Sequence, residues 1–507
     1  MTDFTFAPDH NCWRIEKADR FAVIIDGADY FRALRESLLK ARRLVTLIGW
    51  DFDFEIEMLP GESDAEGNAP DGYPNQIGPF LDALVDQHEG LDIYLLKWSG
   101  GALIAPGGVM PALQIKFLSP DQVHLAFDGR HPIGACHHQK IVVIDDSLAF
   151  CGGIDVTAGR WDTRDHLPGD PRRSRDGEVA QAWHDATTVM TGSAAAALGE
   201  LSRARWEHAN DAPMDEEFKP GENRWPDSVR PDFTDIDVAI ARTEPPERDA
   251  PAVGEIEFLY LDSIRAARDV IYLESQYFAA DSITRAIHAR LQEPDGPEVV
   301  VINPDAAQNV IEDQAMHITR SRMLRDLAAA DPYGRFVMLF PVDDDGDSIY
   351  VHAKISIIDD SFLRIGSSNI DRRSMGFDTE CDVAVQATRS RDKGRILDIR
   401  NDLIAEHLGC DPREFARVLR REGSVIAAIR RLNRPALGRG LRPVKPRREN
   451  LFGRFLADTR FSDPRYRRSA QSRLGLTSRH LFLGAAAAGA GIYLWSRISS
   501  SSSGDED

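Results

Sequence analysis

Residues 137–155 read HHQKIVVIDDSLAFCGGID, and this stretch decides the fold of the chain. It contains an H-x-K-x4-D triplet made of His138, Lys140 and Asp145. The four residues between the lysine and the aspartate are all β-branched, so we expect a buried strand there. Side chains two positions apart on a strand point to the same face, so the histidine and the lysine are expected to project together. The Gly152-Gly153 pair that follows suits a turn whose backbone comes close to an anion.

The same pattern returns 214 residues later, in YVHAKISIIDDSFLRIGSSN at residues 350–369. The second triplet is followed by the motif Gly-Ser-Ser-Asn, and its members are His352, Lys354 and Asp359. In both copies seven residues separate His from Asp, and seven separate Asp from the first glycine. A single histidine on a strand is usually a satisfied core residue. Two triplets in register indicate instead a duplicated catalytic half-site.

The doubled set brings two imidazoles and two ammonium groups to one pocket, which suits a phosphodiester substrate. The lysines would neutralise the non-bridging oxygens, while one imidazole attacks phosphorus and the other protonates the leaving alcohol. Each aspartate is expected to orient an imidazole, although the pairing stays open. Histidine and aspartate are also common metal ligands. The recurring partner is a lysine, which binds no metal when protonated, so the sequence predicts metal-free chemistry without a cofactor.

These motifs resemble those of the phospholipase D superfamily, whose members react through a phosphohistidine. The resemblance extends to eukaryotic-type phospholipases D through the segments GGIDVTAGRWDTRDH, AWHD, LESQYF and SSNIDRRSM…DTE. It implies that His138 is the nucleophile and that His352 is the general acid, which then activates water or an alcohol. The expected substrate-binding residues are Gly152, Gly153, Asp155, Gly366, Ser367, Asn369, Gln276 and Glu380.

The expected activity is therefore hydrolysis of glycerophospholipids such as phosphatidylcholine to phosphatidic acid, with possible transfer to another alcohol. The alternatives are a cardiolipin-type phospholipid synthase, a nuclease and a membrane-bound scaffold without activity. Asp155 stands where many superfamily members have Asn, and Asp378 stands where bacterial cardiolipin synthases tend to have Asn. Both positions favour the phospholipase. The scaffold is disfavoured because both triplets are intact.

The duplication is expected to cover whole domains. YFRALRESLLKARRLVTLIGWDF places apolar residues on one helical face before a β-rich run, and DSIRAARDVIYLESQYF repeats this order. We therefore expect an α/β protein with two tandem α-β-α sandwich domains, at residues 1–210 and 251–410. The two halves would form a phospholipase D-like pseudo-dimer with one active site at the seam. Residues 211–250, rich in Pro, Asp and Glu, are expected to be a surface linker.

The charge of the chain changes sharply after the second half. Residues 411–480 hold 19 Arg or Lys against six Asp or Glu, which leaves a net charge of −31 on the first 410 residues. Such an acidic body disfavours nucleic acid as a partner, because affinity for phosphate backbones is mostly cationic. The basic tail contains a helical pattern at 413–433. This helix is expected either to lie on anionic lipid or to pack on the catalytic body through its apolar side.

Residues 481–496 form an uncharged run, LFLGAAAAGAGIYLWS. A helix of this length reaches about 24 Å, somewhat less than the ~30 Å hydrocarbon core of a bilayer. Although the run is short, it carries no charge, and residues 481–497 are expected to be a membrane anchor. The alternative is a helix docked on protein or lying at the membrane interface. Together with the basic tail, this run predicts a phospholipid membrane as the partner.

The expected location is the cytoplasmic face of a membrane. The first residues, MTDFTFAPDHNCW, lack the basic region and the long apolar core of a signal peptide. The five cysteines are scattered, without disulfide or zinc spacing, which is typical of a reducing compartment.

Overall fold

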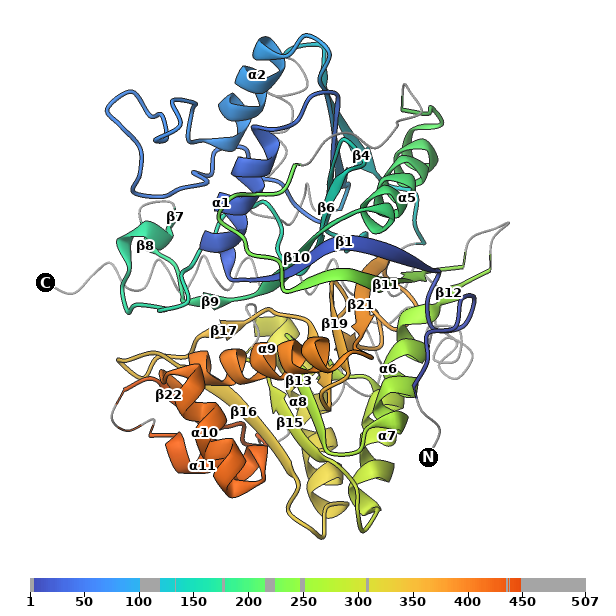
Figure 1. Ribbon diagram of the computed structural model, residues 1–507, viewed down its shortest axis with the longest axis vertical. Coiled ribbons are helices and arrows are strands. Elements are labelled where there is room, and N and C mark those ends of the chain that lie inside the picture. The colour runs from blue at the N-terminus through green and yellow to red at the C-terminus, as the bar shows by residue number, and fades with distance from the viewer. Residues whose placement is uncertain are drawn as a thin grey trace, which may run out of the picture.

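The computed structural model describes residues 4–447, with gaps at 101–118, 133, 176–177, 215–223, 247–250, 307–309, 435 and 437 (Figure 1). The first half combines strands and helices in this order: β1 (Arg14–Ile25), α1 (Gly27–Leu38), β2 (Leu44–Gly49), α2 (Ile77–Gln87), β3 (Asp92–Trp98), β4 (Val123–Asp128), β5 (Ile141–Ile144), β6 (Leu148–Gly152), β7 (Ser174–Arg175), β8 (Glu178–Val179), β9 (Trp183–His184), β10 (Ala186–Thr191) and α5 (Ser193–Asn210).

The second half repeats the main strands and helices of the first, has a further helix, α8, between β15 and β16, and adds two helices and a strand at its end. Its elements are β11 (Phe233–Glu244), β12 (Val253–Gly254), α6 (Glu255–Ala266), β13 (Val270–Glu274), β14 (Phe278–Ala279), α7 (Asp281–Gln292), β15 (Glu298–Ile302), α8 (Val310–Ala329), β16 (Phe336–Val342), β17 (Tyr350–Val351), β18 (Ile355–Ile358), β19 (Phe362–Gly366), β20 (Ile370–Asp371), β21 (Glu380–Gln386), α9 (Ser390–Leu408), α10 (Pro412–Glu422), α11 (Val425–Leu432) and β22 (Gly440–Pro443).

One large mixed sheet runs through both halves, in the order β22-β16-β15-β13-β18-β19-β21-β11-β1-β10-β6-β5-β2-β3-β4. The order is symmetric about the β11–β1 pair, because every strand in it except β22 has its counterpart at the same distance on the other side. In each half three parallel strands, β2-β3-β4 or β13-β15-β16, continue into antiparallel ones. This symmetry confirms the predicted α/β architecture of two similar halves, and it shows that their sheets join edge to edge.

Helices cover both faces of this sheet (Figure 1). Neighbouring residues of β2 alternate between two apolar cores, because successive strand side chains point to opposite faces. Leu44 and Ile48 pack in a core that includes residues of α5 and α9 and crosses both halves. Val45 and Leu47 pack on the other face with α1 and α2, and the second half packs α6, α7 and α8 around a third core.

The prediction of a surface linker at 211–250 is wrong for residues 233–244. These residues form β11, a central strand that pairs with β1 and β21. The start of β11 resembles a linker in sequence, because it mixes exposed polar residues with buried apolar ones and directly follows a Pro- and Asp-rich stretch. The other predicted domain boundaries stay predictions.

The single basic helix expected at 413–433 is two helices, α10 and α11. Gly423 adopts a left-handed conformation that ends α10, and Ser424 caps α11 by accepting a hydrogen bond from the backbone N–H of Ala427. Phe415 and Ile429 belong to the core that crosses both halves, so this part of the tail packs on the catalytic body. Strand β22 then extends the sheet beside β16.

No helix in the described ranges is long and apolar enough to cross a membrane. The predicted anchor at 481–497 lies outside the described residues, as does the tail beyond residue 447.

Candidate active site

The two triplets lie at the start of β5 and β18, which occupy equivalent places in the two halves of the sheet. His138 and Lys140 immediately precede β5, and His352 and Lys354 immediately precede β18, so they are not within the strands as predicted. The backbone pairing of β5 with β6, and of β18 with β19, continues beyond the strand ends to the two lysines. The backbone N–H of Gly152 donates to Lys140 O, and that of Gly366 donates to Lys354 O, each at 3.3 Å.

Backbone pairing between the halves places a carboxylate beside each histidine. The His138 N–H donates to Thr379 O at 2.8 Å, and the next residue after the threonine is Glu380. The His352 N–H donates to His184 O at 2.8 Å, and the next residue after that histidine is Asp185. Each motif histidine therefore receives its carboxylate from the opposite half of the chain.

His138 contacts Glu380 through its Nδ1 atom, which lies 3.0 Å from Oε2 and 3.1 Å from Oε1. The hydroxyls of Ser367 and Ser374 also donate to this carboxylate, at 2.5 and 2.7 Å. Burial raises the pKa of Glu380 to about 8, although the two hydroxyls and the charge of Lys140 favour its ionised form. Burial and the charges of both lysines lower the pKa of His138 well below its usual range. The ring is thus neutral, and the contact at Nδ1 leaves Nε2 available for chemistry.

His352 contacts Asp185 in the same way, with Nδ1 2.6 Å from Oδ2. Burial alone would raise the pKa of Asp185, but the adjacent imidazole and the charge of Lys354 lower it to about 2. Gly153 makes this arrangement possible, because a Cβ there would lie 2.3 Å from Asp185 Oδ1. The carboxylate of Asp185 is therefore ionised at neutral pH, whereas that of Glu380 is close to its pKa.

The two lysines differ in their surroundings. Lys140 Nζ lies 3.0 Å from Asp155 Oδ2, in an ion pair that is almost fully buried. The residue at the equivalent position in the second half is Asn369, a neutral amide. Burial lowers the pKa of Lys354 to about 7, although the charge of Asp185 opposes this shift.

Asp145 and Asp359 do not orient the imidazoles, so this prediction is wrong. The carboxylate of Asp145 accepts hydrogen bonds from the backbone N–H groups of Arg42, Arg43 and Leu44, at 2.9–3.0 Å. That of Asp359 accepts equivalent bonds from residues 268–270, at 2.8–2.9 Å. Four strand residues span about 13 Å, so each aspartate lies at the far end of its strand from the histidine. The carboxylate of Asp145 thus holds the start of β2, and that of Asp359 holds the start of β13.

Comparison with known proteins agrees with this geometry. A family model described as "Cardiolipin synthase, PLD-like domain" matches residues 260–394. Phospholipase D alpha 1 from Ricinus communis is 23% identical over an alignment that covers 77% of this chain and 66% of that protein. The enzyme of the same name from Arabidopsis thaliana is 23% identical over 79% of this chain and 65% of its own length. The chain is similar to proteins of the phospholipase D superfamily.

The superfamily fold is also seen in the crystal structure of phosphatidylserine synthase from Haemophilus influenzae. It aligns with a TM-score of 0.54 and 12% sequence identity, over 77% of this chain and 88% of that one. The chain spans slightly less than two thirds of the length of the plant enzymes, as the coverage above shows.

The remaining predicted residues lie around the two triplets of this phospholipase D superfamily site. Gln276 donates its side-chain amide to the hydroxyls of Tyr277 and Tyr350, at 2.9 and 3.0 Å. Tyr350 stacks on Trp183, whose ring also lies 5.0 Å from that of His352. The glycine-containing turns lie where β6 and β19 end, next to the lysine carbonyls.

Sequence reasoning missed Asp185 and Ser374 as functional residues. The segment AWHD was noted only as part of the superfamily resemblance. The duplication itself held a usable signal, because a site with two equivalent histidines needs a second carboxylate to match Glu380. Asp185 directly precedes β10, and β10 and β21 occupy equivalent places in the two halves of the sheet.

Proposed function

We propose that this protein is a phospholipase D that hydrolyses glycerophospholipids such as phosphatidylcholine to phosphatidic acid and the free head-group alcohol. The observation that supports it is the pair of largely buried imidazoles, each with Nδ1 on a carboxylate from the opposite half and with a lysine two residues away. This arrangement provides a nucleophile, a general acid and two cations for one phosphodiester.

In the first step His138 Nε2 attacks phosphorus, and the bond from phosphorus to the head-group oxygen breaks. His352 gives its Nε2 proton to the departing alcohol. Lys140 and Lys354 neutralise the non-bridging oxygens as negative charge develops on them. The product of this step is a phosphohistidine that carries the phosphatidyl group.

In the second step His352 takes a proton from water, and the water oxygen attacks phosphorus. The bond from phosphorus to His138 Nε2 breaks, which releases phosphatidic acid. An alcohol in place of water would give transphosphatidylation. The ionised Asp185 stabilises an imidazolium on His352 more than Glu380 does on His138, and this supports the division of roles. Asp185 acts against burial and the charge of Lys354, which lower the pKa of His352 well below its usual range.

A cardiolipin-type phospholipid synthase is the second candidate, and the family model that matches residues 260–394 favours it. In that reaction the accepting alcohol is a second phospholipid, while the steps at phosphorus are unchanged. The hydrolase and the synthase therefore differ in the accepting molecule, water or a second phospholipid, and not in the two histidine–lysine triplets.

The proposed partner is an anionic membrane surface at the cytoplasmic face. Helix α10 supports this, because Arg413, Arg417, Arg420 and Arg421 are exposed while Phe415 is buried against the body. Each such arginine near anionic lipid contributes about 1 kcal/mol to binding. All five cysteines are free thiols, which suits a reducing compartment.

The test is product analysis on phosphatidylcholine vesicles, with and without ethanol, and on phosphatidylglycerol vesicles. Phosphatidic acid that turns into phosphatidylethanol when ethanol is present is the expected result. Cardiolipin formed from phosphatidylglycerol, without hydrolysis, would support the synthase. No product from any lipid would overturn both, and His138→Asn serves as the inactive control.

A further inference from the structure

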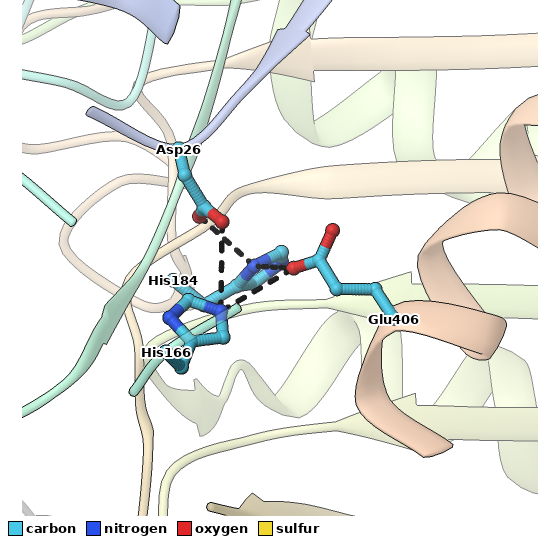
Figure 2. Close-up of side chains that lie close together, drawn as sticks. All are labelled: Asp26, His166, His184 and Glu406. Carbon is cyan, nitrogen blue, oxygen red and sulfur yellow. Dashed lines mark hydrogen bonds and ion pairs between the residues drawn. The ribbon is translucent and has the colours of Figure 1, made fainter. Parts of the chain in front are cut away.

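A second cluster of titratable side chains lies next to the active site and takes no part in the proposed reaction. It consists of Asp26, His166, His184 and Glu406, which come from the end of β1, a loop, β9 and α9 (Figure 2). All four side chains are buried, with exposed fractions of 3% or less. Their facing atoms all lie within 4.8 Å of one another.

Three of the six distances between these atoms are close to the edges of a metal tetrahedron. His166 Nε2 lies 3.5 Å from Asp26 Oδ2 and 3.4 Å from Glu406 Oε1, and His184 Nδ1 lies 2.9 Å from the same Glu406 oxygen. Ligands at about 2.0–2.1 Å from a zinc ion, in a tetrahedron, are about 3.3–3.4 Å apart. These three distances lie within about half an ångström of that spacing, so the four side chains already surround a space where one ion could bind.

Two of the four atoms have no hydrogen bond in the described part of the chain. They are Asp26 Oδ2 and His184 Nδ1, both buried and both turned into the cluster. The other oxygen of Asp26 already accepts the backbone N–H of Asp185, at 3.0 Å. A buried polar atom without a hydrogen bond is costly, and a coordinated cation would remove that cost.

The outer atoms of the ligands are held by further polar groups, as in known metal sites. His166 Nδ1 lies 2.8 Å from Asp162 Oδ2, and His184 Nε2 lies 2.8 Å from Glu274 Oε2. Each carboxylate thus accepts the proton on the outer ring nitrogen and turns the lone pair of the inner one toward the cluster. Arg164 donates to the outer oxygen of Glu406 at 2.5 Å.

The ligand set also suggests the class of ion. Two carboxylates and two neutral imidazoles carry two negative charges, which a divalent cation balances. Four-coordinate sites with imidazole ligands suit zinc and its neighbours in the transition series, whereas calcium and magnesium take six or more oxygens. The competing arrangement has no metal and a proton on each imidazole.

We infer that Asp26, His166, His184 and Glu406 form a tetrahedral site for a divalent transition-metal ion of the zinc type. The site is structural, because all four protein ligands fill its coordination positions. It also connects two distant parts of the chain, since three ligands come from the first half and Glu406 comes from α9.

The ion would also position the catalytic acid, a consequence that rests on the proposed function. The backbone carbonyl of His184 accepts the N–H of His352, and the next residue, Asp185, holds the His352 ring. Fixing the His184 side chain therefore fixes the strand that presents the carboxylate.

The first experiment measures metal content of the full-length protein by mass spectrometry, after exposure to zinc and gel filtration. About one zinc ion per chain is expected, with a zinc-dependent rise in melting temperature after chelator treatment. X-ray absorption should show only nitrogen and oxygen ligands. Wild-type protein without bound metal and without a zinc-dependent melting shift would overturn the inference and leave two protonated imidazoles as the counter-charge.

Variants then identify the ligands. His166→Gln should lose the bound zinc, while His10→Gln, which removes a surface histidine paired with Asp262, should keep it. Asp162→Asn should lower zinc affinity by about 10- to 100-fold, because it loosens a ligand without removing it. Unchanged zinc binding in both His166→Gln and Asp162→Asn would contradict the assignment. Metal content is read independently of lipid turnover, so failure of the proposed function would leave this result intact.

Discussion

His138 Nδ1 lies 3.0 Å from the carboxylate of Glu380, a residue 242 positions later in the chain. The pseudo-symmetric contact joins His352 to Asp185, 167 positions earlier. The two halves therefore exchange their carboxylates, and neither half alone supplies both members of either of these two pairs.

The motif aspartates should affect stability and not chemistry. In Asp359→Asn the side-chain amide replaces one of the oxygens that accept the backbone N–H groups of residues 268–270. We expect a loss of about 0.5–1.5 kcal/mol in the free energy of unfolding, the usual net contribution of a hydrogen bond, because these bonds are exposed or partly buried. Denaturant titration measures this loss. The turnover number of the folded variant should stay within about twofold of wild type. A loss of about a hundredfold or more would instead indicate that Asp359 has a catalytic role.

The two histidines should respond differently to the leaving group. His352→Asn should stop turnover of phosphatidylcholine but retain activity on a p-nitrophenyl phosphodiester, whose leaving group departs without a proton. His138→Asn should be inactive on both, because no phosphohistidine forms. Single-turnover assays with both substrates measure this split. Equal loss on the two substrates in both variants would argue against separate roles for the two residues.

Stability should depend on pH through Glu380. Burial raises its pKa from 4.5 to about 8 in the folded protein. The folded state then holds a proton that the unfolded state has lost, so this contribution to stability is present below pH 4.5 and disappears as pH rises to about 8. Glu380→Gln cannot ionise, so it should gain stability relative to wild type between pH 5 and pH 8.5. A gain on the order of 1–3 kcal/mol is expected.

Thermal unfolding at several pH values measures that gain. Glu89→Gln, at an exposed glutamate, is the control and should follow the wild-type pH dependence. A constant difference between Glu380→Gln and wild type across this pH range would contradict a raised pKa.

Activity should fall at alkaline pH as Lys354 loses its proton. Burial lowers the pKa of Lys354 to about 7. In the first half Lys140 pairs with Asp155, whereas the equivalent residue in the second half is the neutral Asn369. Asn369→Asp places a carboxylate there and should move the descending limb of kcat/KM to higher pH by about one to three units. Profiles of kcat/KM against pH for wild type and variant measure this shift, since kcat/KM reports groups of the free enzyme. An unmoved limb would assign the decline to another group.

The sequence by itself determined the duplication, the α/β class and the two histidine–lysine motifs of the proposed site. Each of these depends on a pattern that is local in the chain. The repeat at 214 residues, the β-branched runs and the flanking glycines can all be read without knowing which segments meet. The superfamily resemblance rests on the same local motifs.

Only the tertiary structure decided which carboxylate serves which histidine. The nearest acidic candidates in sequence, Asp145 and Asp359, are removed from the site because a strand carries them away from the histidines. The pairs that form depend on backbone pairing between the halves, at Thr379 and His184. The four residues of the inferred metal site are spread from position 26 to position 406, with no ligand spacing to reveal them. Contacts between segments so distant in sequence arise only when the sheet joins the two halves.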